Sequence, residues 1–206
     1  MNLFLSPLEK LDRFNNYLKL FKNNPTFAES LYDYFKIRLK VYVTEYDLGT
    51  LESHSDDEWS DINLRGGILA VEGTECEMIA AMYLISTGCN IKMIDTKDNQ
   101  VSGIDFMITK PVWKLPYSVS VKKRPIRENS LVLYKSDFPS NVVDRVAFVD
   151  PISGFVMQGP YSYFKAVYDN RSDKTVASVR VSLYNLTDSK ITKIQNINSL
   201  FEGIHK

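Results

Sequence analysis

The sequence predicts a mixed α/β fold in one domain over residues 1–206. Its length of 206 residues is close to the range of about 100–200 residues that is typical of one domain. Hydrophobic residues make up 44% of the chain and charged residues 24%, which permits a buried core and excludes a disordered chain. Segments in which apolar residues have helical spacing also alternate along the chain with segments of strand character.

The first elements expected are a short helix over residues 7–13, a short strand over residues 17–21 and a long helix from Thr26 to Tyr42. Thr26 is a favourable N-cap for the long helix, and Glu29 three residues later completes a capping box. The long helix has apolar residues at spacings of three and four, and Arg38 falls on this stripe. A charged side chain in that position has to be paired or face a cavity.

An acidic loop follows the long helix, between Leu48 and Asn63. Two apolar runs come next, Ile68–Val71 and Met78–Ile85, with residues 72–75 between them. Because both runs are apolar at consecutive positions, we expect a hairpin of two central strands that are buried on both faces.

The second half of the chain is expected to consist mainly of strands. These are Ile104–Ile108, Leu131–Tyr134, Val142–Val149 and Val176–Leu183. Asp150–Gly159 is predicted to be a glycine-containing loop, Pro160 to open a helix that reaches about Asp169, and the tail from Thr187 to form a weak final helix.

Charge and cysteine content limit the partners and the compartment. The chain has 25 Lys and Arg against 25 Asp and Glu, so the whole-chain charge indicates neither nucleic acid nor an anionic membrane as a partner. Cys76 and Cys89 flank one expected strand, and their distance of about 30 Å along it excludes a disulfide. Without a signal peptide or an apolar run long enough to span a membrane, a cytoplasmic protein is expected. His54 and His205 are isolated, so no metal site is expected.

Four segments match the motifs of one known family. Arg38-Leu-Lys-Val-Tyr42 is similar to its Arg-x-x-Val-Phe segment, and Asp56-Asp-Glu-Trp-Ser-Asp61 to its Glu-x-Asp-x-x-Asp loop. The strand motif Val-Gly-x-x-Arg-Leu-Leu-Pro-Thr resembles residues 79–87, and Ser-Arg-Phe-Ala-Val resembles residues 144–149. The chain thus resembles the Gcn5-related N-acyltransferase (GNAT) superfamily, in the branch of acyl-homoserine lactone synthases and N-acyl amino acid synthases. This resemblance implies a mixed, mostly antiparallel central sheet with helices on both faces.

The resemblance implies transfer of a fatty acyl group from acyl carrier protein, or from acyl-CoA, to the amine of an amino acid or similar acceptor. The donor would lie where the strand 142–149 splays from the strand 176–183. Backbone N–H groups near Phe148 and Val149 would hold the thioester oxygen as charge develops on it. The remaining catalytic role, removal of the amine proton, falls to Asp56, Glu58 or Asp61.

Other side chains are expected to bind the two substrates. Those expected to bind the acceptor are Arg38, Trp59, Tyr83 and Arg145, because a guanidinium pairs well with a carboxylate. Those expected to bind the acidic carrier protein or its phosphopantetheine are Lys122, Lys123, Arg124, Arg127, Gly154 and Gly159.

Two departures from the family's motifs leave alternatives open. Tyr83 stands where lactone synthases have Arg, and Val142 stands where they have Glu. These departures count against a lactone synthase that uses S-adenosylmethionine, which is one alternative, and they favour the other alternative, a non-catalytic GNAT-like binding domain. The acidic loop could equally be solvated surface, and Arg38 could be part of a structural ion pair.

Overall fold

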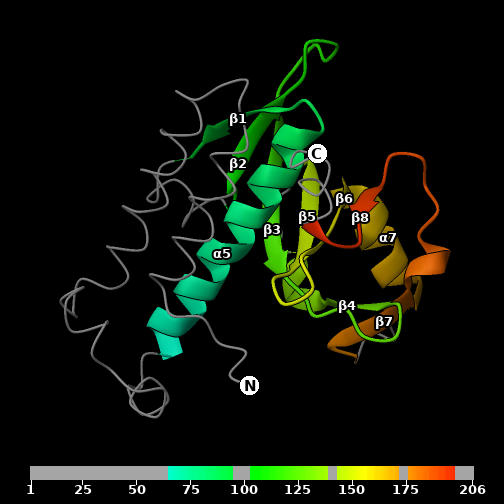
Figure 1. The fold of residues 1–206 in the computed structure, drawn as a ribbon. Helices are drawn as coiled ribbons and strands as arrows, with labels where there is room; N and C mark the ends of the chain where they lie inside the picture. Colours follow the sequence, from blue (N-terminus) through cyan, green and yellow to red (C-terminus); the bar gives the residue numbers. More distant parts are fainter. Residues whose placement is uncertain (1–64, 95–102, 139–142, 172–175, 198–206) are drawn as a thin grey trace, which may run out of the picture. The chain divides into compact units, whose positions relative to one another are not determined.

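The computed structural model describes residues 65–94, 103–138, 143–171 and 176–197 (Figure 1). The chain divides into two compact units, residues 1–78 with 204–206, and residues 79–203. The helices and strands expected before residue 65, and the acidic loop, lie outside the described residues. The single domain expected over residues 1–206 stays a prediction.

The described elements begin with one long helix and continue mainly with strands. They are α5 (Arg65–Ser86), β1 (Asn90–Met93), β2 (Phe106–Thr109), β3 (Tyr117–Lys123), β4 (Ser130–Tyr134), β5 (Arg145–Asp150), β6 (Phe155–Pro160), α7 (Tyr161–Arg171), β7 (Ser178–Ser182) and β8 (Thr192–Ile194), with short 3-10 helices at Lys135–Asp137 and Leu183–Asn185. None of the helices in the described part of the chain is long and apolar enough to cross a membrane.

Helix α5 replaces the hairpin that the sequence predicts over residues 68–85, so that prediction is wrong. A continuous apolar run fits a buried helix as well as a buried strand, and Ala, Leu, Met and Glu all favour helix. The helix ends where Gly88 takes a φ of +80° and its N–H donates to Ile85 O at 2.8 Å. Thr87 Oγ1 also donates to Leu84 O at 2.8 Å, which satisfies another of the last helical carbonyls. Cys76 and Cys89 are both buried.

A six-stranded sheet in the order β1-β2-β3-β5-β6-β8 forms the centre of the unit 79–203. Its strand pairs are antiparallel except for β3 and β5, which run parallel. The mixed α/β class and the mostly antiparallel sheet are therefore confirmed. The strands expected in the second half of the chain are present as β2, β4, β5 and β7, with bounds shifted by a few residues.

The glycine-containing loop expected over Asp150–Gly159 is instead a β-hairpin, because Phe155–Pro160 forms β6 and pairs with β5. Asp150 organises the turn by accepting from Ile152 N at 3.1 Å and from Ser153 Oγ at 2.9 Å. The helix expected to open at Pro160 is confirmed as α7. In the expected C-terminal helix, residues 192–194 instead form β8, which gains its hydrogen bonds from β6 far away in sequence.

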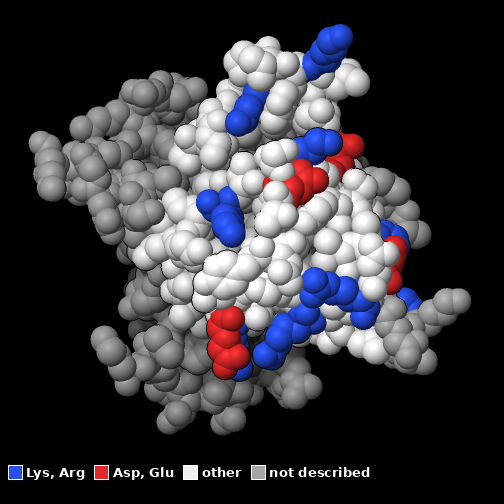
Figure 2. Space-filling view, turned by 90° about the vertical axis from the view of Figure 1, so that its right-hand side faces the viewer, with Lys and Arg blue, Asp and Glu red and all other residues white. Residues whose placement is uncertain are grey.

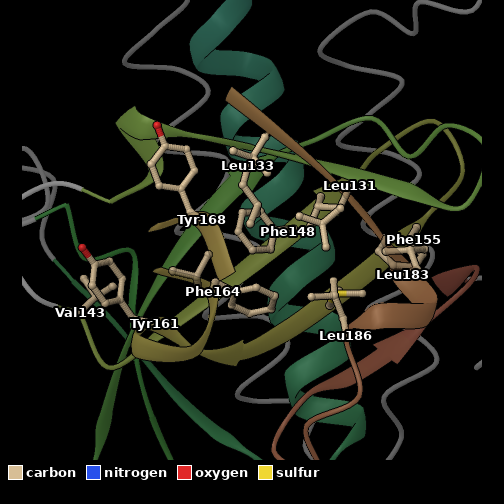
Figure 3. Close-up of a cluster of buried hydrophobic side chains, with 14 residues drawn as sticks. Leu131, Leu133, Val143, Phe148, Phe155, Tyr161, Phe164, Tyr168, Leu183 and Leu186 are labelled. Carbon is tan, nitrogen blue, oxygen red and sulfur yellow. The ribbon is translucent and has the colours of Figure 1, made fainter. Parts of the chain in front are cut away.

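The core lies between one face of the sheet, α7 and a separate two-stranded sheet of β4 and β7 (Figure 3). Phe164 of α7 packs edge-to-face on Phe148 of β5, with ring centroids 4.9 Å apart. Leu131 and Leu133 enter this core from β4 (Figure 3), and Val179 and Val181 enter it from β7. Each strand of the small sheet therefore turns one side toward the core. Ala147 and Val149 on the opposite face of β5 are fully buried, so that face is covered as well.

Candidate functional site

Charge is segregated along the chain, although its total is zero. Residues 103–197 contain 14 Lys and Arg against 8 Asp and Glu, a net charge of +6, whereas residues 1–102 contain 10 against 16, a net charge of −6. The last nine residues contribute one of each sign. The whole-chain count hides this asymmetry, which counting each half separately reveals.

Burial of acidic side chains makes the surface of the second half more basic still. Asp105, Asp137 and Asp150 are all buried. Asp137 forms an ion pair with Arg124 and accepts from Tyr134 N at 2.8 Å. On the face shown in Figure 2, blue side chains outnumber red ones, and a run of blue crosses its lower part. A polyanion approaching this face would meet an excess of positive charge.

Asp105 lies beside the part of β3 that carries Ser120 and Lys122. Asp105 directly precedes β2, and its N–H donates to Val119 O at 2.9 Å. Its Oδ2 accepts from Val121 N at 2.6 Å, which anchors the carboxylate to the backbone of β3 between Ser120 and Lys122. Because side chains alternate along a strand, Ser120 and Lys122 share one face of β3.

These three side chains are largely withdrawn from water. Asp105 is 8% exposed, Ser120 is 3% exposed and Lys122 is half-buried. Charges act more strongly on one another and on a bound ligand where water is excluded. An anchored carboxylate, with a hydroxyl and an ammonium next to it on β3, can provide a metal ligand, a hydrogen-bonding group and a cation.

The start of β3 is tied to the start of β5 by a small polar network. Asp144 Oδ2 accepts from Ser118 N at 2.8 Å and from Ser118 Oγ at 2.7 Å. Asp144 N in turn donates to Ser118 Oγ at 2.9 Å. These bonds hold the parallel strands in register next to Ser120, so they position the face described above.

Arg145 is held by neighbouring groups of the sheet. Its Nε donates to Gln158 Oε1 at 2.7 Å and its Nη2 to Lys190 O at 3.0 Å. Gln158 Nε2 donates onward to Thr192 Oγ1 at 2.6 Å, so the network joins β5, β6 and β8. Burial lowers the pKa of Arg145 from its ordinary value, against the smaller opposing effects of neighbouring groups. This geometry accounts for Arg145 as a structural cross-link of three strands.

The groups expected to bind a thioester are occupied in the structure. Phe148 and Val149 are fully buried in β5, which has β3 on one side and β6 on the other. Val149 O accepts from Arg124 N at 2.7 Å. The strand 176–183 does not lie beside β5, because β7 pairs with β4 in the small sheet. The splayed pair of strands expected to hold the acyl donor is therefore absent from the described residues.

The other predicted site residues that the structure describes do not gather at one place. Tyr83 is buried in α5 and not on a strand. Gly154 and Gly159 pack closely against Asn196 and Phe164 respectively, so both glycines serve packing. Lys122 and Lys123 belong to β3, Arg124 binds Asp137, and Arg127 is exposed beyond the strand. The remaining predicted residues, Arg38, Asp56, Glu58, Trp59 and Asp61, lie outside the described residues.

Comparison with known proteins does not identify a family for this chain. No family model matches the chain, and no curated protein matches it. One solved structure that matches is described as that of the bacterial homing endonuclease I-Ssp6803I, with a TM-score of 0.39 and 15% identity. The match covers 66% of this chain and 87% of that one, and at this TM-score the likeness carries no argument.

The expected membership of the GNAT superfamily is wrong. Neither a family model nor a curated relative supports it, and β7 pairs with β4 instead of lying beside β5. The acyltransferase function and acyl carrier protein as partner, which rested on that resemblance, fall with it. The cytoplasmic location stays a prediction.

Proposed function

We propose that this protein cleaves phosphodiester bonds in nucleic acid, with Asp105, Ser120 and Lys122 as its reacting centre. The observation that carries the proposal is the hydrogen bond that anchors the Asp105 carboxylate on Val121 N, between Ser120 and Lys122 of β3. The net charge of +6 over residues 103–197 supports a polyanionic substrate. This replaces the expectation, drawn from the whole-chain charge, that nucleic acid is not a partner.

The residues fit a hard divalent cation such as Mg²⁺ better than zinc. The described part of the chain has no group of three His, Cys, Asp or Glu side chains that could hold a metal ion. Mg²⁺ does not need such a group, because it keeps several waters and uses one or two carboxylates together with substrate phosphates. Asp105 would be the protein ligand, and a bound cation would supply a water of lowered pKa and polarise the phosphate.

Lys122 and Ser120 would act on the substrate itself. The Lys122 ammonium would stabilise negative charge that develops on the phosphate oxygens, and the Ser120 hydroxyl would orient a phosphate oxygen or the attacking water. In this hydrolysis the water oxygen bonds to phosphorus and the ester P–O bond breaks. The products are a phosphate monoester and an alcohol, whose oxygen takes up a proton as the water loses one.

Cleavage of end-labelled DNA and RNA, single- and double-stranded, in the presence of Mg²⁺ or Mn²⁺ tests the proposal. Asp105→Asn and Lys122→Met should each lower the cleavage rate by about 100-fold or more, which is typical for removal of a group that stabilises transition-state charge. Ser120→Ala should lower it less. Lys123→Met is the matched control, because this neighbour removes the same charge from the opposite face of β3.

The proposal requires that Lys123→Met changes the rate by less than about threefold while EDTA abolishes it. Equal losses in Lys122→Met and Lys123→Met, or cleavage that persists in Asp105→Asn, would overturn the assigned centre. Thermal melts of all variants distinguish loss of chemistry from loss of folding.

Non-catalytic binding of nucleic acid is a second candidate, favoured by the segregation of charge. It predicts that the logarithm of the binding constant falls linearly with the logarithm of the salt concentration, and that no metal ion supports cleavage. Binding by the wild type and by Asp105→Asn with equal affinity, without product, would select it over cleavage.

A further inference from the structure

The small sheet of β4 and β7 has a side that faces away from the core. Side chains alternate along both strands. The core cluster contains two residues from each strand, which are Leu131 and Leu133 of β4 and Val179 and Val181 of β7. The other side, here called the ribbon face, consists of Ser130, Val132, Tyr134, Ser178, Arg180 and Ser182. Register pairs Val132 with Arg180 and Tyr134 with Ser178 across it.

Positive charge surrounds the ribbon face. Arg180 is exposed at its centre, Arg127 is exposed just before β4 and Lys135 just after it. Among the described residues these three side chains have no ion-pair partner. The neighbouring Asp137 is buried and neutralised by Arg124. Glu128 is an exposed acid in the turn between Arg127 and Ser130, just before β4.

Aromatic side chains and hydroxyls complete this surface. Tyr134 is 41% exposed and stacks under the Arg124 guanidinium, whose carbon lies 4.6 Å from the ring centroid. Tyr184, directly after β7, is 74% exposed, and its hydroxyl accepts from Asn129 Nδ2 at 3.4 Å. Cations with exposed rings and hydroxyls are the groups that contact phosphates, sugars and bases.

From these features we infer that the ribbon face docks in the major groove of double-stranded DNA. The inference rests on the proposed function, since it names the surface through which the substrate is held. A B-form major groove about 12 Å wide admits a two-stranded ribbon, whereas the A-form major groove of RNA is too narrow and deep for side chains to read. Five residues of strand span roughly 16 Å, comparable to five base pairs, so Arg180 would reach base edges while Arg127 and Lys135 contact phosphates.

Fluorescence anisotropy with a 20-base-pair duplex, in Ca²⁺ or EDTA to prevent cleavage, tests the inference. Removal of one cation that binds a phosphate should reduce the slope of log K against log salt by about 0.9, which corresponds to roughly fivefold weaker binding at 0.15 M salt. In the triple variant Arg127→Gln, Arg180→Gln, Lys135→Gln, loss of the two phosphate contacts should weaken binding about 25-fold and loss of the Arg180 base contact about a further fivefold, so on the order of 100-fold in total. Lys193→Gln on β8 removes an exposed charge away from the ribbon face and should have little effect.

The outcomes separate this inference from the proposed function. Normal duplex binding by the triple variant, with cleavage still dependent on Asp105, would overturn the ribbon face and leave the reacting centre intact. Weaker binding in the triple variant alone, with no cleavage by any form, would support the ribbon face and overturn the reacting centre. An equal reduction of affinity in Lys193→Gln, or tighter binding to an RNA duplex than to DNA, would overturn the ribbon face.

Discussion

Gly154→Ala should destabilise the protein because a side chain at this position would be both strained and crowded. Gly154 has a φ of +69°, where an L-residue costs about 1–2 kcal/mol. An added Cβ would also lie 2.9 Å from Asn196 Oδ1 and 3.1 Å from the backbone N of Ile197. That N–H donates to Gly154 O at 2.8 Å, so the neighbour cannot move without breaking a hydrogen bond. Crowding of this kind costs about 1–3 kcal/mol, which brings the total to about 2–5 kcal/mol.

Gly88→Ala is the matched control, because Gly88 has a φ of +80° but nothing within 4 Å of an added Cβ. It should cost only the backbone term of about 1–2 kcal/mol. Thermal and urea unfolding measure both variants, and for a chain of this size about 2–4 °C accompanies each kcal/mol, so Tm should fall by roughly 4–20 °C in Gly154→Ala. Equal destabilisation of the two variants would refute the packing argument. A Gly154→Ala protein of unchanged stability that no longer binds phosphate would restore the phosphate-loop interpretation.

Three further predictions concern stability. Asp137→Ala should lower the free energy of unfolding by about 3–5 kcal/mol in urea titrations, because it deprives the Arg124 guanidinium of its buried partner. Asp169→Ala, which breaks the exposed pair with Lys165, should change it far less. Glu128→Gly should raise the midpoint of the same titration, because Glu128 sits at a φ of +51° and Gly relieves a strain of about 1 kcal/mol; an unchanged midpoint would contradict this. Burial raises the pKa of Tyr161 above its ordinary value of about 10, so the folded state holds this proton more tightly than the unfolded chain. Stability should thus be complete below pH about 10 and fall as pH rises through the folded-state pKa, and Tyr161→Phe should flatten this fall above pH about 10.

Local patterns were sufficient for several elements of the second half. Strands such as β4 and β7 have alternating or β-branched residues, and α7 starts directly after Pro160. The run over residues 78–85 was ambiguous, because uninterrupted burial removes the periodicity that separates helix from strand. Helix propensity and the C-terminal cap at Gly88 favour the helix α5 over a strand in this segment.

The candidate centre escaped sequence reasoning for a different reason. Asp105, Ser120 and Lys122 show no spacing motif, so only the hydrogen bond from Val121 N to Asp105 reveals that the carboxylate lies beside Ser120 and Lys122. Lys122 was singled out as part of a basic run, although strand alternation separates it from Lys123. The charge asymmetry between the halves was readable from the sequence, but the zero total concealed it.

Composition and local periodicity by themselves determined a mixed α/β protein with a buried core, a helix after Pro160 and a basic second half. These properties depend on residue type and on neighbours within a few positions. Tertiary structure alone decided that β7 joins β4, that β8 closes the sheet against β6, and that Arg145 is a cross-link. The physical reason is that strand pairing satisfies backbone hydrogen bonds between residues far apart in the chain, and no local pattern specifies which partner a strand will find.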